Sequence, residues 1–352
     1  MDNCISKLNN SRKVYQRLSD DYSRLLFEKR CMFSLTGDYR YILDIINSMP
    51  QKKTVDEMMR KMDSVKDKLI VWGAGNDYGI MKRLYPEWEF ICFVDRVEEK
   101  QKSGFAGKSV ISPEAFYEKY SDCYVAVNST GSFKEIADDL RGHGISEERI
   151  INLGEQYYDI YHKQYFDPEI ISFRPDEVFI DGGAFDGSTA RMFERVTGGI
   201  YKKIIAFEPG AENIGYFNYR DKLQHVERME IHQKGLWSNS TTLTFSGDGT
   251  QGARIDMASA GGFSIDTISI DELEDAKDIT FIKMDVEGAE LEALKGAKET
   301  ILKNHPKLTI CLYHKPEDIF EIPAYILSLS DDYRFFIRHY QLSDCETLLY
   351  AV

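Results

Sequence analysis

One glycine-rich segment, VFIDGGAFDGS, combines residue types that build a ligand site at the end of a strand. A buried apolar run leads into Asp181, Gly182 and Gly183, and Gly187 follows just before a helical stretch. Glycines at such a point let the backbone turn tightly and let a ligand approach the main chain. The two acids of the loop, Asp181 and Asp186, favour a cationic ligand, because a pyrophosphate prefers a loop without added negative charge.

A second carboxylate, Glu208, ends the next apolar run. It follows Asp181 by 208 − 181 = 27 positions, which is where an adjacent parallel strand would place it. A carboxylate there can accept hydrogen bonds from both hydroxyls of a ribose. The alternative is that Glu208 only caps the helix that begins near Pro209.

The elements that must position these loops are buried strands that alternate with helices. This alternation predicts an α/β domain with a parallel sheet. Two final runs, 333–340 and 346–352, are joined by too short a link for a parallel crossover, so we expect an antiparallel hairpin there. The five runs that precede them are 178–184, 204–209, 230–237, 281–288 and 308–314.

The part of the chain before this domain repeats the pattern on a smaller scale. Residues 66–165 contain strand-like runs at 69–75, 90–95, 124–130 and 150–154, which predict a small doubly wound, Rossmann-like domain. Residues 1–65 carry apolar side chains at helical spacing and predict a helical arm. This arm either packs on the body or pairs with another chain as a homo-oligomer. The remaining residues, 166–352, form the larger domain.

Four motifs of the larger domain resemble, in the same order, those of FkbM-type methyltransferases. They are Asp181-Gly-Gly-Ala-Phe-Asp-Gly187, Ala206-Phe-Glu-Pro209, Lys234-Gly-Leu-Trp-Ser238 and Ile282-Lys-Met-Asp-Val-Glu-Gly-Ala-Glu290. The resemblance covers residues 176–352. It implies a Rossmann-like class I methyltransferase sheet, S-adenosylmethionine as methyl donor with S-adenosylhomocysteine as product, and transfer to a hydroxyl of a small sugar-containing or related acceptor.

The resemblance also implies roles for the matching residues. Asp181 and Gly183 would contact the methionine part of the cofactor and Glu208 its ribose, whereas the strand end Asp285-Val-Glu287 would face the reaction centre. The alternative for Asp285 and Glu287 is that they cap the helical stretch 289–302. The cofactor-binding set is then Asp181, Gly182, Gly183, Gly187, Glu208, Gly235, Leu236 and Asp285, with Gly235 and Leu236 near the adenine.

Transfer of a methyl group to an unactivated hydroxyl requires a group that takes the proton. His314 ends the run 308–314 and is the leading candidate for this base, because ligands bind beyond the carboxyl ends of parallel strands. The alternative is a histidine bonded to its own turn, with Lys315 and His339 as substitutes. Asp285, Glu287 and His314 are thus the predicted catalytic residues. The same three could hold a divalent metal ion, which we do not favour from the sequence.

The smaller domain has a glycine loop of its own. Asp95 follows the second glycine, Gly75, by 95 − 75 = 20 positions, as in dinucleotide-binding folds. The third glycine, Gly79, comes one place late for that motif, and a structural or docking role is the favoured alternative. If the domain binds a nucleotide or nucleotide-sugar, the candidate contacts are Gly73, Gly75, Gly79, Asp95, Asn128, Ser129 and Thr130.

The composition limits the partners. A formal net charge of −14, with basic and acidic residues interspersed, argues against nucleic acid as a partner. No apolar run approaches the roughly 20 residues of a membrane span, and the polar start lacks the core of a signal peptide, so we expect a cytoplasmic protein that does not bind membranes. The loop 246–262 is rich in glycine and serine and is a candidate lid.

Two other functions compete with methyl transfer. The first is an NAD- or nucleotide-sugar-binding oxidoreductase or epimerase that uses residues 69–95, but we find no convincingly placed Tyr-x-x-x-Lys or comparable hydride-transfer group. The second is a non-catalytic assembly protein built on a methyltransferase fold. The intact set Asp181, Glu208 and Asp285 argues against the second.

Overall fold

The computed structural model describes residues 2–75, 77–129, 132–246, 254–255 and 263–352. The chain forms two compact units. Unit 1 comprises residues 1–45, 164–339 and 344–352, and unit 2 comprises residues 46–163 and 340–343. The helices predicted for residues 1–65 are therefore divided between the two units.

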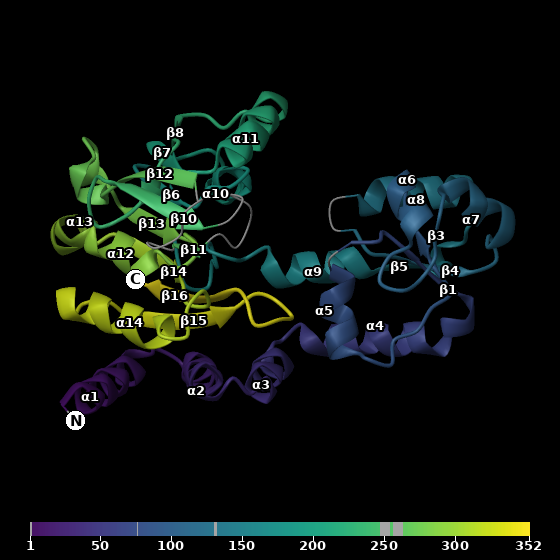
Figure 1. Ribbon diagram of the computed structural model, residues 1–352, viewed down its shortest axis with the longest axis horizontal. Coiled ribbons are helices and arrows are strands. Elements are labelled where there is room, and N and C mark those ends of the chain that lie inside the picture. The colour runs from purple at the N-terminus through teal and green to yellow at the C-terminus, as the bar shows by residue number, and fades with distance from the viewer. Residues whose placement is uncertain (1, 76, 130–131, 247–253, 256–262) are drawn as a thin grey trace. The chain divides into compact units, whose positions relative to one another are not determined.

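The main sheet of unit 1 has seven strands. They are β6 (Val178–Gly182), β7 (Lys203–Phe207), β8 (Met229–His232), β13 (Phe281–Met284), β14 (Lys307–Cys311), β15 (Phe335–His339) and β16 (Thr347–Ala351). Their order is β15-β16-β14-β13-β6-β7-β8 (Figure 1). The five strands from β14 to β8 are parallel, and β16 is antiparallel to both β14 and β15. This confirms the predicted α/β fold class, with five parallel strands finished by an antiparallel hairpin.

Helices follow most of the parallel strands of this sheet. They are α10 (Ser188–Thr197), α11 (Ala211–Leu223), α12 (Glu290–Lys295), α13 (Lys298–Asn304) and α14 (Asp318–Leu329), with 3-10 turns η3 (Ile270–Glu272) and η4 (Ala276–Asp278) before β13. An aromatic cluster joins α10 to the sheet: the rings of Phe179 and Phe281 stack at 4.7 Å, and the ring of Phe193 lies 4.5 Å from that of Phe179. All three side chains are fully buried, which explains why the strands read as continuous apolar runs.

The carboxyl ends of the central strands lie along one edge of the sheet. Gly182 at the end of β6 pairs in register with Phe207 of β7 on one side and with Met284 of β13 on the other. The loops that carry the predicted site residues therefore leave from neighbouring strands.

The prediction of a single strand over 230–237 is wrong, because this segment forms two strands that belong to different sheets. The Lys234 amide donates to the His232 carbonyl at 2.8 Å, and this tight turn ends β8. A second sheet, in the order β11-β10-β12-β9, is formed by β9 (Gly235–Leu236), β10 (Thr242–Ser246), β11 (Arg254–Ile255) and β12 (Phe263–Ile268). The candidate lid 246–262 lies outside the described residues except for residues 246 and 254–255.

The single helix expected over 289–302 is also interrupted, and α12 and α13 meet at Gly296. A Cβ atom at Gly296 would lie only 2.0 Å from the backbone oxygen of Trp237. The chain therefore approaches the backbone after β9 more closely than any other residue type allows at this position.

The N-terminal helices of unit 1, α1 (Asp2–Arg17) and α2 (Asp21–Thr36), pack against α14 and the edge strand β15. The Ser19 amide donates to the Phe335 carbonyl at 2.8 Å, and the Ile337 amide donates to the Ser23 hydroxyl at 2.9 Å. Asp20 caps α2 by accepting from the Ser23 amide, and it pairs with Arg338 at 2.7 Å. Packing on the body is therefore observed for α1 and α2, and pairing with another chain stays a prediction.

Unit 2 contains a five-stranded sheet. Its strands are β1 (Leu69–Trp72), β2 (Phe93–Val94), β3 (Val110–Ile111), β4 (Tyr124–Val127) and β5 (Ile150–Asn152). All pairs are parallel and the order is β3-β2-β1-β4-β5, which confirms the predicted doubly wound arrangement. Sequence analysis missed the two-residue strand β3 and extended β5 too far, since Leu153 already begins a helix.

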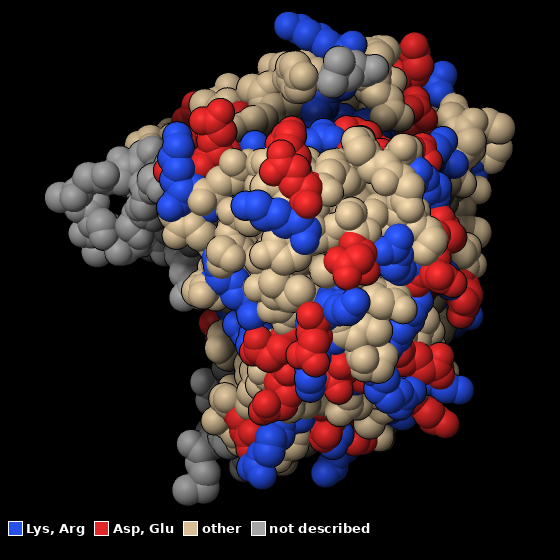
Figure 2. Space-filling view, turned by 90° about the vertical axis from the view of Figure 1, so that its right-hand side faces the viewer, with Lys and Arg blue, Asp and Glu red and all other residues tan. Residues whose placement is uncertain are grey.

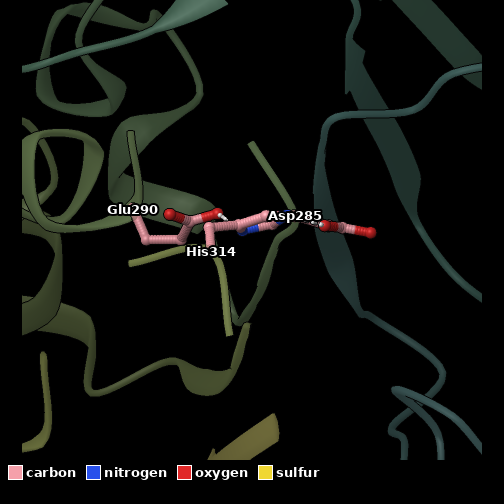
Figure 3. Close-up of side chains that lie close together, drawn as sticks. All are labelled: Asp285, Glu290 and His314. Atoms are coloured by element: carbon pink, nitrogen blue, oxygen red, sulfur yellow. Dashed lines mark hydrogen bonds and ion pairs between the residues drawn. The ribbon is translucent and has the colours of Figure 1, made fainter. Parts of the chain in front are cut away.

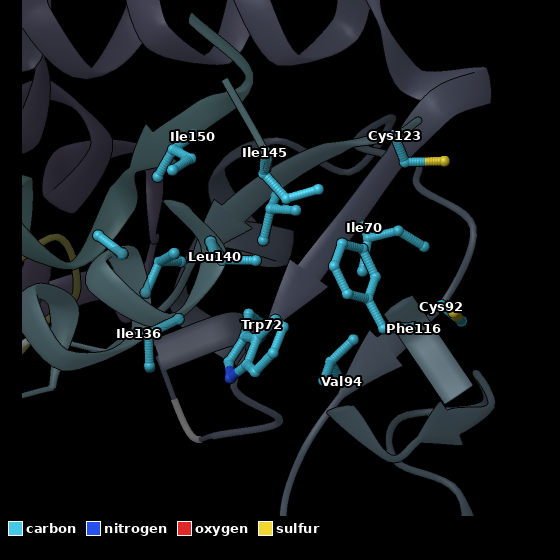
Figure 4. Packing of buried hydrophobic residues seen from close by; sticks show 13 residues of the cluster. Ile70, Trp72, Cys92, Val94, Phe116, Cys123, Ile136, Leu140, Ile145 and Ile150 are labelled. Atoms are coloured by element: carbon cyan, nitrogen blue, oxygen red, sulfur yellow. The ribbon is translucent and has the colours of Figure 1, made fainter. Parts of the chain in front are cut away.

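Helices accompany the strands of unit 2, and some of them bury an apolar cluster against this sheet. They are α4 (Lys52–Ser64), α5 (Asp77–Leu84), α6 (Glu98–Ser103), α7 (Pro113–Lys119), α8 (Phe133–Gly142) and α9 (Leu153–Tyr161), with α3 (Arg40–Ser48) before them and 3-10 turns η1 (Lys66–Lys68) and η2 (Glu147–Arg149) between them. In Figure 4 Trp72 of β1 packs against Phe116 of α7, with ring centroids 5.5 Å apart, and Leu140 of α8 belongs to the same buried cluster.

Charged side chains of both signs alternate over the face shown in Figure 2. Ion pairs of unit 2 include Arg96 with Glu135 at 2.8 Å and Lys108 with Glu89 at 2.8 Å. Among the residues described, no helix is both long enough and apolar enough to span a membrane.

Candidate active site

The loops after β6 and β13 meet at the carboxyl edge of the main sheet. Gly183 has φ +77°, and a Cβ atom there would lie 1.8 Å from the backbone oxygen of Asp285. Only glycine fits both this conformation and this contact. Leu236 of β9 approaches the same loop, because its Cδ1 atom would be 2.7 Å from a Cβ at Gly182. The structure thus brings Gly182, Gly183, Leu236 and Asp285 together.

The buried side chain of Lys283 binds the backbone of this glycine loop. The Lys283 ammonium donates to the carbonyls of Gly182 at 3.1 Å and Gly183 at 2.9 Å, and it lies 3.1 Å from Oδ1 of Asp181. Burial alone would lower the pKa of Lys283, but the carboxylates of Asp181 and Asp285 outweigh it and raise that pKa. Asp181 is itself fully buried against Lys283. Asp181 therefore pairs with Lys283, and its contact with the cofactor stays a prediction.

The second acid of the glycine loop is also neutralised by basic side chains. Oδ2 of Asp186 lies 3.1 Å from Nε of Arg220, and its Oδ1 accepts from the Ser188 amide at 2.9 Å and lies 3.8 Å from Arg191. Both acids of the loop therefore have basic partners, and their preference for a cationic ligand stays a prediction. Gly187 lies at the N-terminus of α10 with φ +75°, where a Cβ would meet the ring of Phe217 at 2.7 Å.

Glu208 lies directly after β7, beside the glycine loop. Its Oε1 accepts from the Gly210 amide at 2.8 Å and from Asn213 at 3.1 Å, and its Oε2 accepts from the Phe185 amide at 3.0 Å. A carboxylate has about four lone-pair positions, so one stays open for a ligand hydroxyl. Glu208 therefore binds the amide of Gly210 and the side chain of Asn213 at the start of α11, and its contact with a ribose stays a prediction.

Asp285 is the central carboxylate of the site. Its Oδ2 accepts from the Tyr165 hydroxyl at 2.7 Å and its Oδ1 from the Tyr313 hydroxyl at 3.1 Å. Burial would raise the pKa of Asp285, but Lys283 and His314 lower it further than burial raises it. Asp285 is therefore ionised at neutral pH and held in one orientation by two tyrosines.

His314 lies between carboxylates, as Figure 3 shows for Glu290 and Asp285. Its Nδ1 is 2.8 Å from Oε1 of Glu290, and its Nε2 is 3.4 Å from Oδ1 of Asp285 and 3.5 Å from Oε2 of Glu287. Burial alone would lower the pKa of this imidazole, but the three carboxylates raise it to about 9. In this setting His314 carries a proton at neutral pH and must lose it before it can act as a base, so the base role stays a prediction.

Glu287 faces His314 and does not cap the following helix. The N-cap position of α12 is Ala289, which makes no side-chain cap bond, and the Val286 amide is instead bound by Glu290 at 2.9 Å. Burial raises the pKa of Glu287, and Glu208 is among the acids that add to this shift. The structure thus contradicts the alternative in which Asp285 and Glu287 cap the following helix.

Sequence analysis missed several residues of this site, namely Tyr165, Lys283, Glu290, Tyr313 and Glu346. Glu346 accepts from Tyr313 at 3.3 Å and from Gln164, and burial together with the charge of Asp285 raises its pKa to about 7. Glu290 belongs to a quoted motif and could have been found by its spacing from Asp285. Tyr165 and Glu346 come from segments without any local signal.

The two predicted substitutes for His314 lie in different surroundings. Lys315 is exposed and extends over Gly288, with its Cε 3.0 Å from a Cβ built there. His339 is buried on β15 and its Nδ1 lies 2.9 Å from the Thr347 hydroxyl. His339 is therefore a core residue of the hairpin.

Near the glycine loop of unit 2, Asp95 is bound by other groups of the same unit. Oδ2 of Asp95 accepts from the Ala74 amide at 3.1 Å and from Lys100 at 3.0 Å. A Cβ at Gly73 would lie 2.7 Å from the Asn128 carbonyl, whereas Gly75 and Gly79 have open space around them. Ser129 follows β4, and Thr130 lies outside the described residues. Asp95, a candidate nucleotide contact, is thus bound by Lys100.

Arg30 of α2 links the N-terminal helices to the loops of the site. Its guanidinium donates to the carbonyls of Asp344 at 2.5 Å and Tyr313 at 3.3 Å, and its side chain is buried. We expect Arg30→Met to lower the free energy of unfolding by about 1–3 kcal/mol, because two part-buried carbonyls lose their charged donor. Thermal unfolding measures this loss. Arg40→Met removes an exposed arginine and should change the free energy of unfolding by less than about 0.5 kcal/mol. Equal effects of the two changes would show that the hydrogen bonds of Arg30 do not stabilise the fold.

Comparison with known proteins agrees with this description. Residues 181–340 match the family model described as methyltransferase FkbM domain, and residues 65–151 match the model described as C2185-like, N-terminal. The predicted resemblance to FkbM-type methyltransferases is therefore confirmed for this part of the chain. A search of curated proteins found no significant match.

The solved structures similar to the chain include methyltransferases. Methyltransferase FkbM from Methylobacillus flagellatus KT is 23% identical over 90% of this chain and 100% of its own, with a TM-score of 0.48. A SAM-dependent methyltransferase from Aquifex aeolicus is 14% identical over 51% of this chain and 84% of its own, with a TM-score of 0.30. Fibrillarin of Aeropyrum pernix, solved with natively bound S-adenosyl-L-methionine, is 9% identical over 52% of this chain and 70% of its own, with a TM-score of 0.30.

Proposed function

We propose that this protein transfers a methyl group from S-adenosylmethionine to a hydroxyl of a small acceptor, such as a sugar-containing metabolite or nucleotide-sugar. The observation that carries the proposal is the arrangement at the carboxyl edge of β7, β6 and β13. Glu208, the glycine turn at Gly183 and the carboxylate of Asp285 lie there on three adjacent parallel strands. The match of this region to the FkbM family model supports the same reaction.

The charge of the site favours this cofactor over a dinucleotide. When bound, S-adenosylmethionine supplies an electrophilic methyl group, and its sulfonium and ammonium are both cationic. The carboxylates at the carboxyl edge of the sheet outnumber the cationic side chains. The resulting negative charge attracts positive ligands and repels negative ones. The carboxylates are Glu208, Asp285, Glu287, Glu290 and Glu346, and the cationic groups are Lys283 and His314.

The proton of the acceptor hydroxyl has two candidate destinations among the described residues. His314 accepts it only in its unprotonated form. Glu346 has a pKa of about 7, which is the range in which a general base works best at neutral pH. Tyr313 joins Glu346 to Asp285 through its hydroxyl and so keeps both carboxylates in place.

A calorimetric titration with S-adenosylhomocysteine tests the cofactor. We expect the unaltered chain to bind it and Glu208→Gln to bind it about 10- to 100-fold more weakly, because a hydrogen bond to a charged carboxylate is worth about 1.5–3 kcal/mol. Glu212→Gln is the matched control, since Glu212 is an exposed acid in the first turn of α11.

The same titration with NADH tests the competing function. Binding of NADH that is insensitive to Glu208→Gln, together with no binding of S-adenosylhomocysteine, would overturn the proposal in favour of the oxidoreductase. The candidate cofactor contacts would then be Gly73, Gly75 and Asp95 in unit 2.

A further inference from the structure

Unit 2 contains a cavity of its own, with a volume of about 170 Å³. Its walls come from α5, from α9 and from residues 340–342, all of which belong to unit 2. The helices α5 and α9 lie side by side (Figure 1) and follow the strands β1 and β5. Ligands of open parallel sheets bind beyond the carboxyl ends of the strands, where such helices begin. The cavity is therefore placed where this fold commonly holds a ligand.

Aromatic and aliphatic side chains form most of the wall. The tyrosines are Tyr157, Tyr161 and Tyr340, and the aliphatic residues are Ile80, Ile160 and Leu342. The buried Tyr157 hydroxyl donates to the backbone carbonyl of Asp77 at 3.4 Å, which joins α9 to the start of α5. Tyrosine rings attract a cation that lies over their faces, whereas aliphatic groups bind hydrocarbon.

Asp77 provides the charge of the cavity. Its carboxylate is half-buried and has no hydrogen-bond or ion-pair partner among the described residues. Burial raises the pKa of Asp77, and the charge of Asp77 in turn adds to the raised pKa of Tyr157. The first turn of a helix favours a negative charge, so the position of Asp77 in α5 alone would keep its carboxylate ionised. A cation beside Asp77 would offset the loss of water around this carboxylate.

The cavity does not suit an anionic ligand. None of the described residues that line it is a lysine or an arginine, and Asp77 would repel a phosphate. The size of the cavity also limits the ligand, since a cavity of roughly 150 Å³ accepts benzene, which has about six non-hydrogen atoms.

We propose that this cavity binds a small organic ammonium ion. Its charged group would lie against the carboxylate of Asp77 and the tyrosine rings, and its hydrocarbon part against Ile80 and Ile160. This binding site does not depend on the proposed methyl transfer.

A ligand-observed NMR titration of the full chain at neutral pH tests the proposal. The probe is pentylammonium chloride, and 1-pentanol is its neutral counterpart of the same length. We expect pentylammonium to bind with a dissociation constant of about 1 mM, as a ligand of about six non-hydrogen atoms can, and 1-pentanol to bind at least about 10-fold more weakly.

Variants of Asp77 and Tyr161 locate the site. Asp77→Asn keeps the shape of the side chain and should weaken binding of pentylammonium about 10-fold or more, because a hydrogen bond to a charged group is lost. It should leave binding of 1-pentanol unchanged. Tyr161→Leu should weaken binding of pentylammonium about 5- to 30-fold, whereas Tyr161→Phe keeps the ring and the affinity.

The matched control is Glu114→Gln, which removes an exposed acid from the first turn of α7 and should bind pentylammonium like the unaltered chain. Circular dichroism checks that each variant is folded. Three results would overturn the site: no binding at about ten times the expected dissociation constant, equal affinity for 1-pentanol, or an affinity that Asp77→Asn does not change. Asp77→Asn should still bind S-adenosylhomocysteine, so failure of the ammonium site leaves the proposed methyl transfer unaffected.

Discussion

Lys283→Met is expected to lower the free energy of unfolding of unit 1 by about 3–5 kcal/mol, the usual cost of leaving one member of a buried ion pair without its partner. The ammonium of Lys283 is 1% exposed, and it joins Asp181 to the carbonyls of Gly182 and Gly183. Methionine fills a similar volume but satisfies none of these acceptors. Urea unfolding followed by circular dichroism measures the loss.

Two controls separate this effect from a general sensitivity to lysine removal. Lys303→Met breaks a pair in which the lysine is 71% and the glutamate 55% exposed, and should cost at most about 1 kcal/mol. The double change Asp181→Asn with Lys283→Met should cost less than the sum of the single changes, because the two residues share one interaction. If the cost of the double change equals the sum of the two single costs, the interaction between Asp181 and Lys283 does not contribute to stability.

Gly183→Ala is expected to weaken binding of S-adenosylhomocysteine at least about 100-fold, or about 2.7 kcal/mol. The added methyl would lie 1.8 Å from the backbone oxygen of Asp285, so the loops after β6 and β13 must move apart. Both loops belong to the proposed cofactor site, and calorimetric titration measures the affinity directly.

Gly198→Ala is the control that isolates the clash. Gly198 also has a positive φ, +62°, but a Cβ there meets nothing within 4 Å. This change should cost only the roughly 1–2 kcal/mol of a left-handed residue and leave the affinity as it was. If the two alanine variants bind the cofactor equally well, the close approach of the two loops does not matter for binding.

Much of the fold could be predicted from the sequence, because the central strands are buried on both faces and end in glycine or acid. The errors have long-range causes. Gly296 inside the expected helix is a weak local sign of a break between α12 and α13. The contact that requires glycine there is with the backbone at Trp237, about sixty positions earlier. The division of 230–237 into two strands depends on β12, which is the partner of β9.

The site was predicted only as far as topology determines it. Asp285, Glu287 and His314 meet because they follow adjacent strands, which the order of the motifs implies. The charge states do not follow from topology: Asp181 is paired with Lys283, and the pKa of His314 is raised to about 9 by Glu290 and two further acids. Such effects depend on which side chains surround a group, and those neighbours come from distant parts of the chain.

The contact between the N-terminal helices and β15 has a consequence for biosynthesis. Leu18 and Ser19 are translated more than three hundred positions before their partner, Phe335. At about 5–20 residues per second the ribosome needs roughly 15–60 s to make the intervening chain. During that time α1 and α2 have no strand to cover and must stay soluble by themselves or with a chaperone. Unit 2, whose strands all lie within residues 69–152, can complete its sheet long before then.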